Sequence, residues 1–246
     1  MTRCLEATSV SEAWVAAVAA VLDDDDQHVN HLLIRATEPL PELDQIRSAC
    51  DELLADLKLQ GVDTVRNTIF PYETALDVPD PDDLTAEYVE MYPALKRLGS
   101  ERGTYFGRIV AYPRADGSTG NQLVETVKKL GAAHAGKRWT STYEVNIYSE
   151  QKDTNITRSF PCMSHLAFHL DGDRLDCLAT YRSHDVIDKA YGNYLGLAQL
   201  QEYLALRSGF TPGELAILAG RAFITTAKRT YPRLREIVAD AGAAAI

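Results

Sequence analysis

A turn signal at Asp171-Gly172-Asp173 separates two runs of alternating apolar and polar residues, and this pattern constrains the fold more than any other feature of the sequence. The two runs cover residues 164–170 and 174–182. Alternation with a period of two is typical of half-buried strands, and Asp-Gly between such runs is a strong hairpin signal. The sequence therefore predicts an antiparallel pair of strands in the second half of the chain.

Helices and further strands are expected on both sides of this hairpin. Apolar residues recur at helical spacing over 10–22, 44–59, 84–98, 121–133, 195–207 and 228–244. Shorter apolar or alternating runs predict strands over 31–36, 105–112, 139–147 and 214–225. Prolines predict a loop over 71–83 and an interruption of the third helix near Pro93. Because helices and strands are mixed without strict βαβ alternation and no linker divides them, we predict one α+β domain over residues 1–246.

The charge and hydropathy of the chain limit its partners. Its 246 residues carry a formal net charge of −10, which opposes broad attraction to a nucleic-acid backbone. A few convergent arginines can still bind one small anion against such a field. The sequence has no run of about 18 apolar residues that could span a bilayer, and residues 1–20 lack the basic and apolar regions of a secretory signal. We therefore expect a cytoplasmic protein that binds neither nucleic acid nor membrane.

Cys162 is the strongest candidate nucleophile in the sequence. The chain has four cysteines and no CxxC pair, which favours reduced thiols over a zinc or disulfide site. Cys162 precedes a predicted strand, Arg182 ends the next one, and Ser183 follows it. Positive charge beside a thiol stabilises the thiolate, which is the nucleophilic form. Arg182 could instead be a structural residue paired with Asp176 or Asp185.

Other potential ligands have simpler interpretations. Cys177 lies within a predicted strand and is expected to be a small buried hydrophobe. His165 and His169 share a strand face but lie about 13 Å apart at roughly 3.3 Å per residue, so one ion could not bridge them. We expect these histidines and His184 to be hydrogen-bonded or solvent-facing, and we predict no metal site.

Seven short motifs follow one another between residues 103 and 225. They are Tyr105-Phe106-Gly107, Asn121-Gln122-Leu123, Lys137-Arg138, Pro161-Cys162, Leu175-Asp176-Cys177, Arg182-Ser183-His184-Asp185 with Asn193, and Pro212-Gly213-Glu214 with Ala219-Gly220. In order and spacing they resemble the thymidylate synthase family and its pyrimidine nucleotide hydroxymethylase members. The resemblance implies a mixed β-sheet flanked by helices, and a homodimer formed through the sheet.

The resemblance also implies a reaction. The Cys162 thiolate would add to C6 of a pyrimidine nucleotide, which makes C5 nucleophilic, and C5 would then take a one-carbon unit from 5,10-methylenetetrahydrofolate. Arg182 and Ser183 would bind the nucleotide phosphate, Asn193 would bond the pyrimidine edge, and Asp185 would face the folate. Asn193 could alternatively be a helix N-cap.

The neighbouring subunit completes the phosphate site in this family. The pair that matches Lys137-Arg138 reaches the phosphate across the dimer interface. Arginine suits that role because its guanidinium binds an oxyanion through two parallel hydrogen bonds, whereas Lys137 would act as a point charge.

The sequence also departs from the family pattern. Met163 stands where the family has a histidine after the nucleophile, and Phe223 and Thr225 replace its sugar-binding His-x-Tyr. The N-terminal Arg-Thr-Gly phosphate loop is not found, and Arg66 is a weak substitute. The helix that carries a catalytic glutamate is also missing, with Glu73 and Glu90 as poor replacements.

These departures indicate a divergent member that differs from an ordinary dUMP methylase. Asn at position 193 favours a uracil base, and the product could carry a methyl or a hydroxymethyl group. Two alternatives remain open. One is folate-independent cysteine chemistry at pyrimidine C5, and the other is a nucleotide-binding homologue without catalysis.

Overall fold

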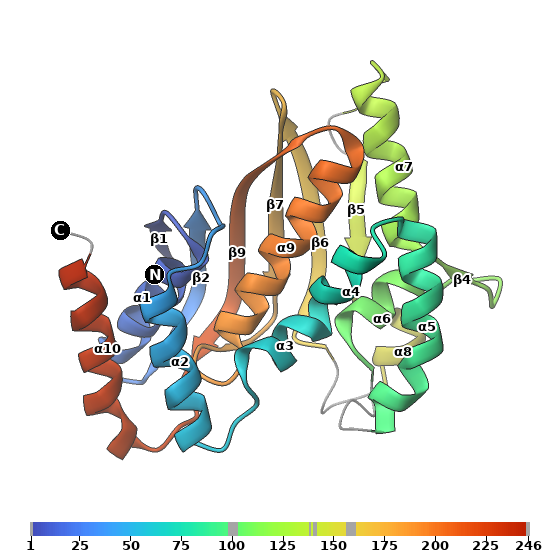
Figure 1. The fold of residues 1–246 in the computed structure, drawn as a ribbon. Coiled ribbons are helices and arrows are strands. Elements are labelled where there is room, and N and C mark those ends of the chain that lie inside the picture. The colour runs from blue at the N-terminus through green and yellow to red at the C-terminus, as the bar shows by residue number, and fades with distance from the viewer. Residues whose placement is uncertain (1, 98–102, 138, 140–141, 156–160, 245–246) are drawn as a thin grey trace.

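The computed structural model describes residues 2–97, 103–137, 139, 142–155 and 161–244 (Figure 1). The strands are β1 (Arg3–Ala7), β2 (His28–Ala36), β3 (Tyr112–Pro113), β4 (Thr119–Gly120), β5 (Tyr143–Asn146), β6 (Met163–Asp171), β7 (Arg174–Tyr181), β8 (His184–Asp185) and β9 (Thr211–Phe223). The helices are α1 (Val10–Leu22), α2 (Asp44–Asp56), α3 (Val62–Ile69), α4 (Tyr72–Asp77), α5 (Pro81–Arg97), α6 (Tyr105–Val110), α7 (Gln122–His134), α8 (Glu150–Asp153), α9 (Ala190–Ser208), a 3-10 turn (Lys228–Thr230) and α10 (Tyr231–Ala244).

A mixed seven-stranded sheet forms the centre of the described structure, in the order β1-β2-β9-β7-β6-β5 with β8 beside β9. β1 and β2 are parallel, and so are β7 and β9, whereas β2–β9, β5–β6 and β6–β7 are antiparallel. Helices α1 and α9 pack directly on one face, and α2 and α3 pack on those helices (Figure 1). The predicted mixed sheet flanked by helices is therefore confirmed.

The two predicted strands around Gly172 form the expected hairpin. β6 pairs with β7 through the register Leu166↔Ala179 and Phe168↔Cys177. A register shift between Met163 and His165 marks a β-bulge at the start of β6. Bulges bend a strand locally and re-aim the side chains beside them. This one lies next to Cys162.

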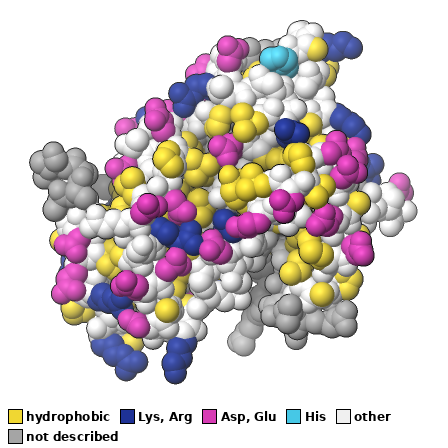
Figure 2. All heavy atoms as spheres, viewed as in Figure 1, with side chains coloured by type: hydrophobic (Ala, Val, Ile, Leu, Met, Phe, Trp, Pro, Cys, Tyr) yellow, Lys and Arg dark blue, Asp and Glu magenta, His cyan; other side chains and the backbone are white. Residues whose placement is uncertain are grey.

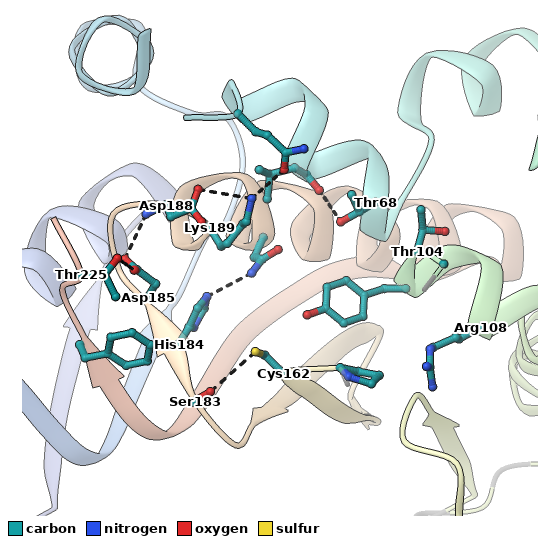
Figure 3. A pocket seen from close by; sticks show the side chains of 17 residues that line it. Thr68, Thr104, Arg108, Cys162, Ser183, His184, Asp185, Asp188, Lys189 and Thr225 are labelled. Atoms are coloured by element: carbon teal, nitrogen blue, oxygen red, sulfur yellow. Dashed lines mark hydrogen bonds and ion pairs between the residues drawn. The ribbon is translucent and has the colours of Figure 1, made fainter. Parts of the chain in front are cut away.

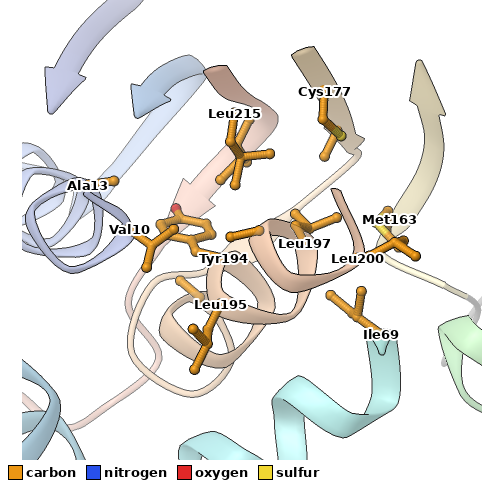
Figure 4. Packing of buried hydrophobic residues seen from close by; sticks show 14 of the residues in the cluster. Val10, Ala13, Ile69, Met163, Cys177, Tyr194, Leu195, Leu197, Leu200 and Leu215 are labelled. Carbon is orange, nitrogen blue, oxygen red and sulfur yellow. The ribbon is translucent and has the colours of Figure 1, made fainter. Parts of the chain in front are cut away.

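Helix α9 is the most buried element of the fold. Every residue from Ala190 to Gln201 is buried, which is the pattern of a helix enclosed on all sides. Figure 4 shows α9 between the strands that carry Leu215 and Cys177 and the helices that carry Val10 and Ile69. Burial of apolar surface stabilises the folded state by about 25 cal/mol per Å². The contacts of α9 therefore hold the sheet and the helices α1 and α3 together.

Two glycines let α3 approach α9 closely. A Cβ atom on Gly192 would lie 2.6 Å from Cβ of Val65 and 2.7 Å from the backbone oxygen of Val62. At Gly196 it would lie 2.8 Å from the backbone oxygen of Arg66. All three distances are shorter than ordinary van der Waals contacts, so a side chain at either position would push α3 away.

Two contacts hold helix α1 in place, a cap at its N-terminal end and a hydrogen bond from Trp14. Ser9 and Glu12 form a capping box, in which the Ser9 hydroxyl accepts from the Glu12 backbone and the Glu12 carboxylate accepts from the Ser9 backbone. Trp14 on α1 donates from Nε1 to the backbone oxygen of Val186 at 2.8 Å. This bond attaches the segment that precedes α9 to the rest of the core.

The predicted strand over 105–112 is wrong, because most of it is helix α6. Its aromatic and β-branched residues favour a strand when taken alone. Thr104, however, caps the segment by accepting a hydrogen bond from the Gly107 backbone at 3.0 Å. Phe106 and Ile109, three residues apart, are both buried on the core side. Capping and tertiary packing therefore outweigh the strand propensity.

The proline-based expectations are also wrong. Pro71 is the N-cap of α4, and Pro81 is the first residue of α5. Proline is well tolerated there because the first backbone N–H groups of a helix have no intrahelical partner. α5 continues through Pro93, whose side chain is exposed. The sequence analysis also missed β1 and α3 altogether.

Acidic and basic side chains are interspersed over the helical face of the molecule (Figure 2). None of the helices in the described ranges is long and apolar enough to cross a lipid bilayer.

We predict that Gly196→Ala lowers the free energy of unfolding by about 1–3 kcal/mol, because the added methyl group meets backbone atoms of α3 that cannot rotate away. Urea denaturation monitored by circular dichroism measures the change.

The matched control is Gly131→Ala in α7, where an added Cβ has no atom within 4 Å. This substitution should leave stability unchanged or raise it by roughly 0.5–1 kcal/mol, since alanine favours helix more than glycine does. Equal effects of the two substitutions would contradict the close-packing account.

Candidate active site

A cavity of about 520 Å³ opens between the ends of the central strands and the helices above them. Its walls come from the segments before β6, after β7 and after β9, from the first turn of α9, and from α3 and α6 (Figure 3). Cys162, Ser183, Asp185 and Asn193 all line it. Four of the residues predicted from the sequence therefore share one cavity.

Cys162 faces two hydrogen-bond donors from the segment after β7. Nη2 of Arg182, which does not itself line the cavity, lies 3.8 Å from Sγ. Oγ of Ser183 lies 3.7 Å from the same atom (Figure 3). The backbone of Arg182 also donates to the Cys162 oxygen at 2.9 Å, which fixes the two segments side by side. The half-buried thiol thus has a cation and a hydroxyl positioned to stabilise its thiolate.

Tyr105 stands beside the nucleophile. Its hydroxyl accepts from the Met163 backbone at 3.5 Å. Burial, with a smaller contribution from the neighbouring Cys162, raises the pKa of Tyr105 to about 12. The phenol therefore stays protonated at neutral pH and can donate a hydrogen bond into the cavity.

Asp185 forms a polar corner at the opposite wall. Oδ1 accepts from the backbone N–H groups of Ile187 at 3.0 Å and Asp188 at 3.1 Å, and Oδ2 accepts from the Thr225 hydroxyl. Phe223 lines the same wall. The residues that align with the family's sugar-binding pair therefore do face the cavity.

Asn193 lies inside α9 and is not its N-cap, which corrects one of the two interpretations of this residue. The N-cap is Lys189, and the Asn193 backbone donates to the Lys189 oxygen at 3.0 Å. The Asn193 side chain is buried, and its Nδ2 lies 3.2 Å from Nε2 of His184. Its amide is therefore available for recognition rather than for capping.

His184 is a buried member of the cavity wall, which decides between the two expectations for this residue. Its ring stacks on Tyr181 at 4.3 Å with an angle of 7° between the planes. Burial lowers the pKa of His184 from 6.5 to about 3, so the imidazole is neutral across the physiological range.

The roof of the cavity is held by a polar bridge. Lys189 donates to Oε1 of Gln60 at 2.7 Å and lies 3.3 Å from the carboxylate of Asp188. All three line the cavity, together with Val65 and Thr68 of α3. The roof therefore carries a charged pair at Lys189 and Asp188, and one apolar and one polar side chain on α3.

Arg108 of α6 closes the other end. It forms a paired interaction with the fully buried carboxylate of Asp153, with N–O distances of 2.7 and 3.0 Å. It also donates to the Ile147 oxygen at 3.2 Å. A bidentate pair of this kind fixes the guanidinium plane.

The remaining predicted residues lie elsewhere. Lys137 is exposed beyond the end of α7 and does not line its own chain's cavity, and Arg138 lies outside the described residues. Arg66 is buried and ion-paired with Glu73, and Glu90 is exposed on α5. None of these last three lines the cavity in the part of the chain that the structure describes.

Sequence reasoning missed several cavity residues. It assigned Tyr105 to a motif without a role, and it did not single out Lys189, Gln60 or Arg108. The Arg108–Asp153 pair spans 45 positions, and no local pattern connects its members. The motif that contains Tyr105, immediately before Gly107, was the one available signal.

A family model described as thymidylate synthase matches residues 80–233. Three proteins to which this name has been assigned provisionally align with the chain, each from a different organism. The Methanothermobacter thermautotrophicus protein is 28% identical over 145 residues, 58% of this chain and 61% of the relative. The Methanopyrus kandleri protein is 27% identical over 61% of this chain and 69% of the relative. The Methanocaldococcus jannaschii protein is 26% identical over 67% of this chain and 80% of the relative.

We predict that iodoacetamide modifies Cys162 and the exposed Cys4 but spares Cys50 and Cys177, because burial raises the pKa of both buried thiols well above its usual range. Arg182→Gln should slow modification of Cys162, since the thiolate loses its cation. Mass spectrometry of the peptides measures both rates. Cys4 is the internal control, and equal slowing at both cysteines would contradict the assigned role of Arg182.

We also predict an acid-dependent contribution of His184 to stability. The pKa of His184 is lower in the folded state, so the unfolded state binds more protons. This contribution is therefore complete above about pH 6.5 and is lost as the pH falls toward about 3. The urea midpoint should fall when the pH is lowered from about 7.5 to about 5. This fall should be smaller in His184→Phe than in the unmodified protein. Equal losses would show that His184 is not the group responsible.

Proposed function

Because the chain belongs to the thymidylate synthase family, we propose that it transfers a one-carbon unit to C5 of a pyrimidine nucleotide. The observation that carries this proposal is the placement of Cys162 in the cavity that Asn193 also lines, with Arg182 and Ser183 both in contact with its thiol. A nucleophile, an anion-binding pair and an amide are the groups that such a reaction requires.

The thiolate of Cys162 adds to C6 of the base, and electron density moves to C5 and O4 as in an enolate. The guanidinium of Arg182 and the hydroxyl of Ser183 hold the phosphate beside the nucleophile. The Tyr105 phenol, held near Cys162, is a protonated donor at the same point. Asn193 bonds the pyrimidine edge. These residues bring nucleotide and thiol into contact, which supplies much of the rate gain through orientation.

The cavity suits 5,10-methylenetetrahydrofolate in two respects. Asp185 presents carboxylate oxygens to the cavity, and such oxygens accept from the ring N–H groups of a pterin. Val65 and Phe223 supply apolar surface for stacking rings. When bound there, the folate would supply the one-carbon unit.

The departures from the family pattern bear on the substrate and product. Met163 replaces a polar neighbour of the nucleophile and is fully buried. Phe223 and Thr225 present less hydrogen-bonding capacity than His-x-Tyr, which supports a sugar other than the usual deoxyribose. Asn193 favours uracil. Both a methyl and a hydroxymethyl product are compatible with these residues, and the experiment below includes their separation.

We propose that the chain, as one domain, forms a homodimer through the face of its sheet that bears no helices in Figure 1. Half-buried side chains from neighbouring strands form a row there, with Leu33 opposite Leu218 and Leu218 opposite Thr180. In such a dimer, Lys137 and Arg138 of one copy would reach the phosphate in the other. This completion explains why a single chain supplies few cations to the site.

Tritium release from pyrimidine nucleotides labelled at C5 tests the proposal. We expect folate-dependent release from a uracil nucleotide, with UMP, dUMP, CMP and dCMP compared side by side. Cys162→Ser should reduce release to background while nucleotide binding persists, because only the nucleophile is changed. Chromatography of the product then separates methyl from hydroxymethyl.

Cys4→Ser is the matched control, since this exposed thiol lies outside the cavity. Folate-independent release would favour the alternative chemistry at C5. An absence of release from all four nucleotides by folded protein that still binds them would favour the non-catalytic homologue.

A further inference from the structure

The side-chain amide of Asn193 has one defined partner within the protein. Its Nδ2 atom lies 3.2 Å from Nε2 of His184, and both side chains are at least 97% buried, with exposed fractions of 3% and 2%. Oδ1 has no hydrogen-bond partner among the described residues and is not sealed from the cavity that Asn193 lines. One end of the amide is therefore held by the protein, and the other end is free to bond a molecule in the cavity.

With the Asn193 amide oriented as in the structure, this contact determines which imidazole nitrogen carries the proton. An amide NH₂ group can only donate, so Nε2 of His184 must accept, and in a neutral ring the proton is then on Nδ1. Reversing the amide would place Oδ1 against Nε2, which would require a proton there instead. The orientation of Asn193 and the tautomer of His184 are therefore coupled.

The surroundings of His184 oppose such a change. The ring is stacked on Tyr181 and meets Tyr194 edge-on at 5.4 Å, so it has little freedom to turn. Nδ1 is buried and has no partner among the described residues, so a proton there is an unpaired donor whose cost the Asn193 contact must offset. A second proton is also disfavoured, because burial keeps the ring neutral.

We propose that His184 is a positioning residue that holds the Asn193 amide with its carbonyl oxygen toward the base, and that this contact makes the site selective for uracil over cytosine nucleotides. The inference rests on the proposed function, because it assumes that a pyrimidine occupies the cavity. It adds to that function a residue that does not touch the substrate but determines which base is accepted.

The chemistry of the two bases explains the selectivity. Uracil has an N–H donor at N3 and an acceptor at O4, so it matches Oδ1 together with the second hydrogen of Nδ2. Cytosine has an acceptor at N3 and donors at N4, so it requires the reversed amide. A cytosine nucleotide would therefore meet an acceptor with an acceptor, or break the contact with His184.

His184→Phe tests the proposal, because phenylalanine can keep the stack on Tyr181 but cannot accept from Asn193. The readout is the ratio of kcat/KM for uracil over cytosine nucleotides, measured by tritium release or, for binding, by the ratio of Kd values. We expect this ratio to fall by about tenfold, the scale of one lost hydrogen bond. A general structural defect would lower both values and leave their ratio unchanged.

Tyr194→Phe is the matched control. It removes a buried hydroxyl from the same cluster, and that hydroxyl has no partner among the described residues. The ratio should stay within about twofold of the unmodified protein. A folded His184→Phe protein that also stays within about twofold would overturn the proposal.

A measurement on the unmodified protein covers the case in which His184→Phe does not fold. ¹⁵N NMR of histidine-labelled protein identifies the tautomer directly, and we expect protonated Nδ1 and unprotonated Nε2, both free and with UMP bound. A protonated Nε2 in the UMP complex would overturn the proposal. The tautomer and the binding ratio do not require turnover, so a failure of the proposed reaction is recognised separately as absent tritium release.

Discussion

Helix α9 is enclosed by the sheet on one side and by α1 and α3 on the other, and each part of the site takes its position from it. Its first twelve residues, Ala190 to Gln201, are all buried. Gly192 and Gly196 leave room for α3, which brings Val65 and Thr68 over the cavity. The same helical turn carries Asn193 beside His184. The packing that stabilises the core and the geometry that serves the ligand are therefore one arrangement.

Buried charge around the cavity is either paired or avoided. The carboxylate of Asp153 is fully buried, and Arg108 neutralises it through two hydrogen bonds. His184 avoids a buried charge by staying neutral, as its low pKa of about 3 shows. Removing one partner of such a pair leaves the other desolvated and unpaired, which costs more than the contact itself contributes. Arg108 and His184 therefore depend on their buried surroundings for their positions in the cavity wall.

Regular periodicity and turn chemistry predicted the large elements correctly, whereas residues with tertiary roles were not predictable from local patterns. The hairpin around Gly172 and the long helices follow from alternation and helical spacing alone. The segment from Tyr105 to Val110 has strand-like composition but is helical, because Thr104 caps it and Phe106 packs inward. Cys162 and its two donors were predicted through the spacing of motifs. Their distances depend on the bulge in β6, which the sequence does not reveal.

The two sides of the cavity come from different parts of the chain. Cys162, Arg182, Asn193 and Phe223 all lie within residues 161–225, on one continuous unit of strands and helix. Gln60, Val65 and Thr68 of the roof come from a separate segment of the first hundred residues. A substitution in that segment would change the shape of the roof and leave the thiol of Cys162 and its neighbours Arg182 and Ser183 in place. The shape of the cavity and the surroundings of its thiol are therefore set by segments that are separate along the chain, although they meet in one cavity.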